Sequence, residues 1–394
     1  MKKILFLLLC CFSSHLFAQW QALPTIPNGS NIKQICFVNA NTGFAVGFSG
    51  TILKTTNGGQ SWNTQTSGTT QNLMSVYFLD ANTGFASGSS GTILKTIDGG
   101  TTWTNQSLTS SYAYMNIDFG NSTTGYCRDN HGSIIKTTDG GTTWLFQSSG
   151  NGLGSVFDVD FVDAINGYTV GGMNGSIQKT IDGGMNWTNQ ASGTINDLYA
   201  CDFIDANRGV AVGVSGTIVK TLDGGATWSS QSSSVTTSLN DVYLYNASTG
   251  WAIGGSGTIL HTSNGGNSWS AQTSGTTVNL LQASFVDSNT GWVLGENGVL
   301  LTLKNAPLSL GQESKLHHVQ VYPNPCKQQL SIDLVNPTTK IEVLDLLGRS
   351  QLQLQTLSVK PSVNLSTLRS GSYILRLTFE EDLIEQIPFL KLDD

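Results

Sequence analysis

The sequence predicts an all-β fold, and three observations support this prediction. Of the 394 residues only 11% are charged while 45 are glycine, a composition that suits short strands joined by tight turns better than helices or a disordered chain. A glycine-centred motif recurs seven times, 41 or 42 residues apart, at Gly43, Gly84, Gly125, Gly167, Gly209, Gly250 and Gly291. After these repeats, alternating apolar segments separated by turns indicate a smaller second β domain, an immunoglobulin-like β-sandwich.

The N-terminal residues 1–18 have the pattern of a secretory signal peptide. Lys2 and Lys3 precede an apolar run over residues 4–11, and Ala18 offers a small residue for cleavage. The apolar run is far shorter than the ~20 residues that a membrane-spanning helix needs. We therefore expect an exported mature chain without a transmembrane segment. The formal charge of −7 argues against nucleic acid as a partner, because phosphates require clustered Lys and Arg.

The repeat over residues 19–305 predicts a seven-bladed β-propeller. A period of ~40–45 residues with four strand-like runs is typical of one blade, which must stack in a ring to bury its faces. In the second copy these runs cover 73–79, 84–88, 92–96 and 102–106. The cysteines at positions 36, 127 and 201 fall at strand positions of separate blades, so we expect isolated buried thiols rather than disulfides.

The seventh copy ends early, and the mature N-terminus is expected to complete it. After Lys304 no Gly-Gly-x-x-Trp segment follows, whereas Trp20 lies 42 residues before Trp62 and in register with the other repeated tryptophans. We expect the segment around Trp20 to supply the outer strand of the last blade. Such closure of the ring removes an open sheet edge.

Six copies carry a Thr-x-Asp-Gly-Gly-x-x-Trp turn, in which Asn replaces Asp twice. The carboxylate can accept backbone N–H bonds within the turn, the glycines can adopt positive φ, and the Trp fills space beside a neighbouring strand. Because an amide substitutes for the acid, we expect a structural role rather than acid/base chemistry. The residues are Asn57, Asp98, Asp139, Asp182, Asp223 and Asn264, with Trp62, Trp103, Trp144, Trp187, Trp228 and Trp269.

A lysine recurs in the third strand of five copies. We expect these side chains to reach solvent or neighbouring carboxylates, with a cationic binding ridge as the less favoured reading. They are Lys54, Lys95, Lys136, Lys179 and Lys220.

The repeated turn resembles the Asp-box of bacterial neuraminidase repeats. The whole unit, with Gly-Phe-Ala-Ser-Gly at 84–88 and Gly-Thr-Ile-Leu-Lys-Thr at 91–96, more closely resembles propellers of the photosystem II assembly factor type. This resemblance implies the fold but no photosystem partner in an exported chain. A neuraminidase-like site would need an arginine cluster, whereas the propeller repeats contain only Arg128 and Arg208.

Candidate binding residues lie where the copies differ. The turns between the second and third strands share one face of a propeller with the connections between blades. In blade three this turn reads Arg128, Asp129, Asn130 and His131 where other copies have small residues, and Tyr112 arrives from the preceding connection. Glu296 is the corresponding residue in blade seven. Such a set suits a sugar or a peptide ligand, against the alternative that these are ordinary solvated loop residues.

A second candidate is a set of aspartates on the innermost strands. Asp118, Asp160 and Asp202 occupy one column of the repeat, and Asp158 and Asp241 lie two residues earlier in theirs. Stacked carboxylates can hold Ca²⁺ or supply an acid/base pair, but more often they line a wet channel or cap backbone groups across blades. We expect no cofactor and no metal site.

The last part of the chain, residues 318–394 after a linker at 306–317, resembles the type A sorting domain of type IX secretion substrates. The resemblance implies passage to the periplasm, recognition by the type IX secretion machinery at the outer membrane, and removal of the domain before release or surface attachment. Its motifs include Tyr322, Pro323, Asn324, Pro325, Gly348, Arg349, Gly371 and Tyr373.

These observations favour a secreted or cell-surface propeller that binds an extracellular protein or glycan, without enzymatic activity. Two alternatives stay open. The first is a glycan-active hydrolase that uses the inner-strand aspartates. The second is a structural or adhesive surface component with no discrete site.

Overall fold

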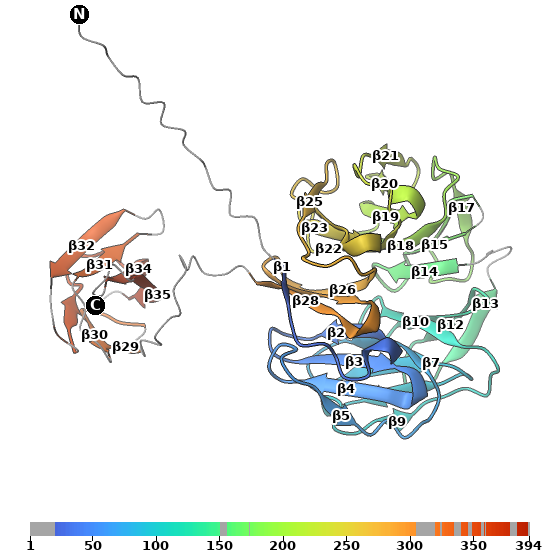
Figure 1. The fold of residues 1–394 in the computed structure, drawn as a ribbon, viewed down its shortest axis with the longest axis horizontal. Helices are drawn as coiled ribbons and strands as arrows, with labels where there is room; N and C mark the ends of the chain where they lie inside the picture. Colours follow the sequence, from blue (N-terminus) through green and yellow to red (C-terminus); the bar gives the residue numbers. More distant parts are fainter. Residues whose placement is uncertain are drawn as a thin grey trace, which may run out of the picture. The chain divides into compact units, whose positions relative to one another are not determined.

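The structure is a computed structural model with two compact units, Met1–Pro307 and Leu308–Asp394 (Figure 1). It describes residues 20–149, 156–172, 174–304, 320–323, 325–334, 340–345, 349–355, 358, 360–378 and 384–392. The expected signal peptide and linker lie outside these ranges. None of the helices within the described ranges is long and apolar enough to cross a membrane.

The first unit is a ring of seven four-stranded antiparallel sheets, which confirms the predicted propeller (Figure 1). Blades one to six follow the chain from the inner strand outwards. Their strands are β2 (Ile32–Phe37), β3 (Gly43–Gly47), β4 (Thr51–Thr55) and β5 (Asn63–Gln65); β6 (Leu73–Phe78), β7 (Gly84–Gly88), β8 (Ile93–Thr96) and β9 (Thr104–Asn105); β10 (Tyr114–Phe119), β11 (Gly125–Asp129), β12 (Ser133–Thr137) and β13 (Leu145–Ser149); β14 (Val156–Phe161), β15 (Gly167–Gly171), β16 (Ser176–Thr180) and β17 (Thr188–Gln190); β18 (Leu198–Phe203), β19 (Gly209–Gly213), β20 (Ile218–Thr221) and β21 (Ser229–Gln231); β22 (Leu239–Leu244), β23 (Gly250–Gly254), β24 (Ile259–Thr262) and β25 (Ser270–Gln272).

The seventh blade is assembled from both ends of the unit. It contains β26 (Leu280–Asp287), β27 (Thr290–Gly295) and β28 (Leu300–Lys304), and its outer strand is β1 (Trp20–Ala22). Trp20 pairs with Leu303, and its indole Nε1–H donates to Gln272 Oε1 of blade six at 2.8 Å. The N-terminal strand therefore covers the edge that β28 would otherwise leave open.

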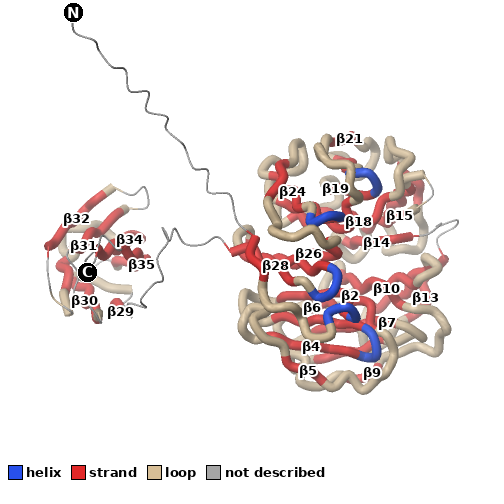
Figure 2. The backbone as a smooth tube through the Cα atoms, viewed as in Figure 1, coloured by secondary structure: helices blue, strands red, loops and turns tan. Residues whose placement is uncertain are grey.

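The two faces of the ring carry different turns. Short 3-10 turns, blue in Figure 2, join the second and third strands of several blades on the connection face, which also carries the blade-to-blade connections. On the opposite face, the Asp-box face, each Asp-box turn bonds to the turn between the first two strands, as in Gly99 N–H to Asn82 O at 2.9 Å. The 3-10 turns are η1 (Gly29–Asn31), η2 (Phe48–Gly50), η3 (Val214–Gly216), η4 (Gly255–Gly257) and η5 (Glu296–Gly298), of which η1 precedes β2.

Stacked aromatic rings join neighbouring blades and explain the repeating glycine. Phe161, at the end of β14, stacks on Tyr126 of the preceding blade with ring centroids 3.4 Å apart. Its ring also covers Gly167, where a Cβ would lie 2.6 Å from the ring. Only a residue without a side chain fits there, so the glycine recurs with the aromatic residue. At the joint of blades five and six, Val210 and Leu244 replace the stacked rings and line a small cavity of about 30 Å³.

The lysine column joins blades too, and the expectation that these side chains reach solvent or carboxylates was wrong. Lys54 Nζ donates to Gly99 O of the next blade at 2.6 Å, and Lys95 donates to Gly140 O at 2.7 Å. Lys136 and Lys179 bond the equivalent carbonyls, while Lys220 bonds Asn267 Oδ1. Each bond satisfies a carbonyl in the Asp-box turn of the following blade. The lysine ammonium groups are therefore engaged in bonds between blades and do not form a cationic binding ridge.

The second unit contains two sheets that enclose an apolar core, as expected of a small sandwich. One sheet holds β29 (Gln320–Tyr322), β30 (Gln329–Asp333) and β33 (Ser362–Asn364). The other has the order β32 (Ser350–Gln355), β31 (Lys340–Leu344), β34 (Gly371–Thr378) and β35 (Ile384–Lys391).

Several sorting-motif residues have a definite place in this second unit. Tyr322 is half-exposed at the end of β29 and precedes Pro323 through a cis peptide bond. Arg349 pairs with Asp345 at 2.8 Å, and the Tyr373 hydroxyl donates to Arg369 O at 3.0 Å. Pro325 follows β29, and Gly371 opens β34. Asn324 and Gly348 lie outside the described residues.

Candidate functional site

The Asp-box turns are closed by their own hydrogen bonds. Asp98 Oδ1 accepts the backbone N–H of Thr102 at 2.9 Å, and Oδ2 accepts the Thr102 hydroxyl at 2.6 Å. These bonds lower the pKa of Asp98 to about 2, the Thr102 hydroxyl having the largest effect. Asn57 accepts the N–H of Ser61 in the same way at 2.9 Å. Because the amide oxygen of Asn accepts the same backbone N–H bond as the carboxylate of Asp, this geometry supports a structural role for the repeated Asp and Asn residues.

The tryptophans of these turns act through packing. The Trp103 ring meets Phe78 edge-on, with centroids 6.1 Å apart and planes at 89°. Equivalent edge contacts hold Trp62 against Phe37 and Trp187 against Phe161. Among the described residues, none of the six Asp-box indole N–H groups has a hydrogen-bond partner. Such an aromatic wedge stabilises the joint between two strands without offering a polar group to a ligand.

In blade three, Arg128 and Asp129 belong to the scaffold. Arg128 lies in β11, not in the turn where the sequence placed it, and its guanidinium donates to the carbonyls of Val156 at 3.1 Å and Phe157 at 2.5 Å. Burial lowers the pKa of Arg128, although Asp158 partly offsets this effect. Asp129 is buried and accepts the N–H groups of His131 and Ser133 at 2.8 and 2.9 Å. Arg128, expected as a candidate binding residue, is therefore engaged by the neighbouring blade instead.

Tyr112, Asn130 and His131 do come together on the connection face. Tyr112 is 45% exposed, and its ring centroid lies 4.5 Å from that of His131. Asn130 Oδ1 lies 3.2 Å from His131 Nδ1 and accepts the N–H of Ala113 at 3.0 Å, which fixes the turn to the connection that carries Tyr112. Glu296 does not join this cluster. It lies in η5 of blade seven, three blades away around the ring, and accepts a bond from Asn279.

The inner aspartates line a central cavity of about 290 Å³ and accept backbone N–H groups of the next blade. Asp118 accepts from Phe161 at 2.6 Å, and Asp160 accepts from Phe203 at 2.7 Å. Innermost strands are sheet edges, so their N–H groups need partners from outside the sheet. Gln and Ser replace the acids in other blades. The remaining bonds of this kind join Asp202 to Leu244, Asp158 to Cys201, Asp241 to Ala283, Gln34 to Val76, Ser75 to Ile117, Gln282 to Ile35 and Ser284 to Phe37.

Desolvation makes these carboxyls unusually weak acids. Burial raises the pKa of Asp118 and of Asp158 to about 6 and that of Asp202 to about 7. Burial and the neighbouring carboxylates also raise the pKa values of Asp160 and Asp241 well above the ordinary range. Burial therefore favours the protonated form of these carboxyls. No group of three or more His, Cys, Asp or Glu side chains in the described part of the chain is arranged to hold a metal ion.

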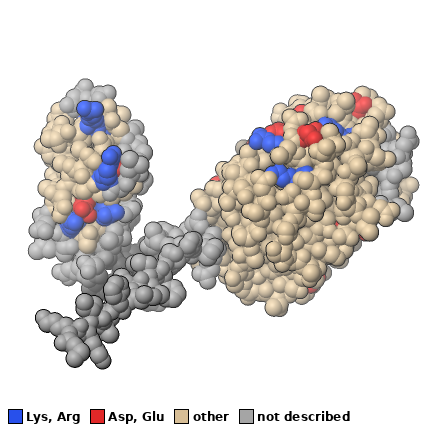
Figure 3. Space-filling model, turned by 90° about the horizontal axis from the view of Figure 1, so that it is seen from above, with Lys and Arg blue, Asp and Glu red and all other residues tan. Residues whose placement is uncertain are grey.

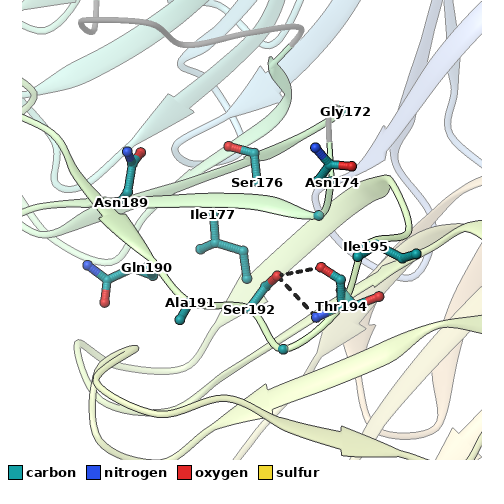
Figure 4. Close-up of a pocket in the computed structure, with 12 residues that line it drawn as sticks. Gly172, Asn174, Ser176, Ile177, Asn189, Gln190, Ala191, Ser192, Thr194 and Ile195 are labelled. Carbon is teal, nitrogen blue, oxygen red and sulfur yellow. Dashed lines mark hydrogen bonds between the residues drawn. The ribbon is translucent and has the colours of Figure 1, made fainter.

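A groove of about 470 Å³ in blade four was not singled out from the sequence (Figure 4). It lies between the turn before β16 and the connection after β17, where Asn174 and Ile177 approach Ser192 and Thr194. Ser192 Oγ bonds the backbone of Thr194, and the described residues that line the groove include no charged side chain. Blade six has a similar groove made of Ser, Thr, Gly and Gln. Because a similar groove occurs in two blades, we attribute it to the repeated fold and not to a ligand-binding site.

No disulfide joins the described cysteines, which are Cys36, Cys127 and Cys201 in separate blades and Cys326 in the second unit. Burial raises the pKa of Cys36 to about 11 and that of Cys201 well above its ordinary value. Buried neutral thiols of this kind are poor nucleophiles.

Comparison with known proteins agrees with this architecture. Residues 61–146 and 230–304 match the family described as photosynthesis system II assembly factor YCF48, and residues 320–387 match the secretion system C-terminal sorting domain. No curated protein matches the chain.

Many solved structures are similar to it, among them the following three. YCF48 bound to D1 peptide has a TM-score of 0.63 at 22% identity, over 73% of this chain and 97% of that one. YCF48 from Cyanidioschyzon merolae has a TM-score of 0.62 at 22% identity, over 73% and 99%. PorZ, a bacterial surface component of the type IX secretion system of Porphyromonas gingivalis, has a TM-score of 0.53 at 13% identity, over 92% and 59%. The chain therefore joins a β-propeller similar to those of photosystem II assembly factors to a C-terminal type IX secretion sorting domain, which supports export to the cell surface or the medium.

Proposed function

We propose that this exported propeller is a non-enzymatic binding module that recognises an extracellular protein or glycan. The observation that carries the proposal is the exposed cluster of Tyr112, Asn130 and His131 on the connection face. An aromatic face beside an amide and an imidazole offers stacking area and hydrogen bonds to the same ligand, which suits a sugar ring or a peptide side chain. A similar propeller is described bound to a peptide. The module would reach its ligand outside the cell after export through the type IX machinery.

The test is a binding screen of the full chain against arrayed glycans and extracellular proteins. The Tyr112→Ala/His131→Ala double variant should lose at least tenfold in affinity for any ligand found, because it removes both rings of the cluster. Tyr245→Ala is the matched control. Tyr245 is 40% exposed and follows β22 at a turn on the Asp-box face. Equal loss in both variants, or no loss in the double variant, would contradict the proposed site.

A hydrolase is the second candidate, and one observation favours it. Carboxyl groups with pKa values of about 6 and 7 share one cavity, and a protonated carboxyl beside an ionised one is what glycoside hydrolysis requires. Against it, the same oxygens are engaged by backbone N–H groups of the next blade. Hydrolysis of an arrayed glycan by the full chain, abolished in Asp160→Asn, would support the hydrolase over the binding module.

A further inference from the structure

One outer strand of the propeller differs from all the others. Outer strands face solvent, and in six blades they are two or three residues long and carry Ser, Thr, Asn, Gln, Trp or Ala. In blade three the outer strand β13 has five residues and begins with Leu145 and Phe146. Their side chains are 70% and 65% exposed. Burial in the ring therefore does not explain the two apolar side chains.

Among the described residues, the backbone of β13 pairs with another strand on one side only. The strand ends its sheet, whose order is β10-β11-β12-β13, and pairs with β12 from Leu145 opposite Lys136 to Ser149 opposite Ser133. Every second N–H and C=O along such an edge points away from the sheet. Natural edge strands are kept short or charged so that they do not pair with other chains. β13 is longer than the other outer strands, and its segment Leu145-Phe146-Gln147 carries no charge.

We propose that β13 is a docking edge for an extended segment of a partner protein, which adds to blade three as a fifth strand. Open backbone groups are satisfied by another strand, and successive apolar side chains point to opposite sheet faces, so Leu145 and Phe146 would contact the added strand from both sides. The segment that fits is uncharged, rich in β-branched residues and free of proline where it pairs. Strand addition already occurs in this ring, where β1 completes blade seven.

The partner is a separate segment rather than a second copy of the propeller. Two copies that met at β13 would bury only a five-residue strand on each side, far less than the ~800 Å² per partner of a stable interface. A bulge at Gln147 also twists the strand. A flexible segment can follow that twist. Figure 3 shows charged side chains gathered in a limited part of the face that it draws. The segment Leu145-Phe146-Gln147 itself carries no charge, so an uncharged partner segment leaves no charge unpaired beside it.

The test uses a labelled peptide with the sequence of residues 131–138 in which Gln replaces Lys136. It is an uncharged form of β12, the strand that already pairs with β13. Fluorescence anisotropy with the full chain should give a Kd on the order of 0.1–1 mM, as expected for a few strand bonds. Leu145→Thr/Phe146→Asn, which copies the residues of blade four, should weaken binding at least tenfold. Ile195→Thr is the control, because Ile195 is 81% exposed but lies outside any strand. It should leave binding unchanged.

Two further measurements separate strand addition from non-specific binding of the peptide to the exposed apolar side chains. A peptide with proline in place of the second isoleucine should not bind, and hydrogen exchange should show protection of the Phe146 amide when the original peptide binds. Equal binding of the proline peptide, equal loss in Ile195→Thr, or no binding at millimolar peptide would overturn the proposal. Sedimentation that showed a dimer of the full chain, lost in the double variant, would also overturn it, because the occupant would then be a second copy.

Discussion

Replacing Asp202 by Asn should stabilise the propeller at alkaline pH and leave it unchanged at acid pH. Burial raises the pKa of Asp202 from 3.8 to about 7, so between these values the folded chain holds a proton that the unfolded chain has lost. Stability of the wild type therefore falls as pH rises from about 4 to about 7. The amide of Asn has no proton to lose. It keeps an oxygen that can accept the N–H of Leu244.

The size of the expected stability difference follows from the pKa shift of Asp202. A full displacement of about three pKa units corresponds to roughly 4 kcal/mol at 1.36 kcal/mol per unit. Asp202 is only partly buried in the lining of the cavity, and its titration depends on the neighbouring carboxyls, so we expect about half of that value. At pH 8 the Asp202→Asn variant should then be about 2 kcal/mol more stable than the wild type, and at pH 4 the two should agree within about 0.5 kcal/mol.

Urea unfolding followed by tryptophan fluorescence measures this difference for the propeller alone, because all nine tryptophans lie between Trp20 and Trp292. Asp202→Ala is the control. It removes the acceptor and leaves the N–H of Leu244 unpaired, which should cost about 1–3 kcal/mol at pH 4. A difference between Asp202→Asn and the wild type that is the same at pH 4 and pH 8 would refute the reasoning.

Three other substitutions test the joints between blades, each by urea unfolding. Arg128→Ala should destabilise the ring by about 2–3 kcal/mol, because two partly buried carbonyls of β14 lose a charged donor; a neutral result would return Arg128 to the candidate ligand site. Gly125→Ala should destabilise it by at least about 2 kcal/mol, since its Cβ would lie 2.6 Å from the Phe119 ring, and a tolerated alanine would contradict that packing. Lys95→Met should cost about 1 kcal/mol through the lost bond to Gly140 O, and an effect that disappears in 1 M salt would indicate solvent-exposed electrostatics instead.

The fold followed from the sequence because neighbouring blades make the same contacts at a fixed separation. Phe119 packs on Phe85 and Phe161 packs on Tyr126, each 34 or 35 residues apart, and a glycine accompanies each ring. Such contacts impose one period on the whole propeller. The period therefore predicts the blade, the number of copies and the place of Trp20 in the ring.

The candidate site was harder to predict, because it depends on departures from the repeat. Arg128 is polar and adjoins a turn, which suggested a ligand-facing side chain, yet its partners are carbonyls 28 and 29 residues further along in the next blade. Leu145 and Phe146 depart from the repeat in the opposite way, because they are apolar at positions that hold small or polar residues in the other blades. Their role as a docking edge could be inferred only from their exposure and from the edge position of β13 in its sheet.

The sequence by itself determined the class, the period and the two-part organisation of this protein, while tertiary structure decided what its exceptional side chains do. A repeated contact leaves a repeated pattern that can be read along one chain. The direction of a single side chain such as Arg128, and the accessibility of a strand such as β13, depend on the blade packed beside it. Those neighbours exist only once the ring has closed.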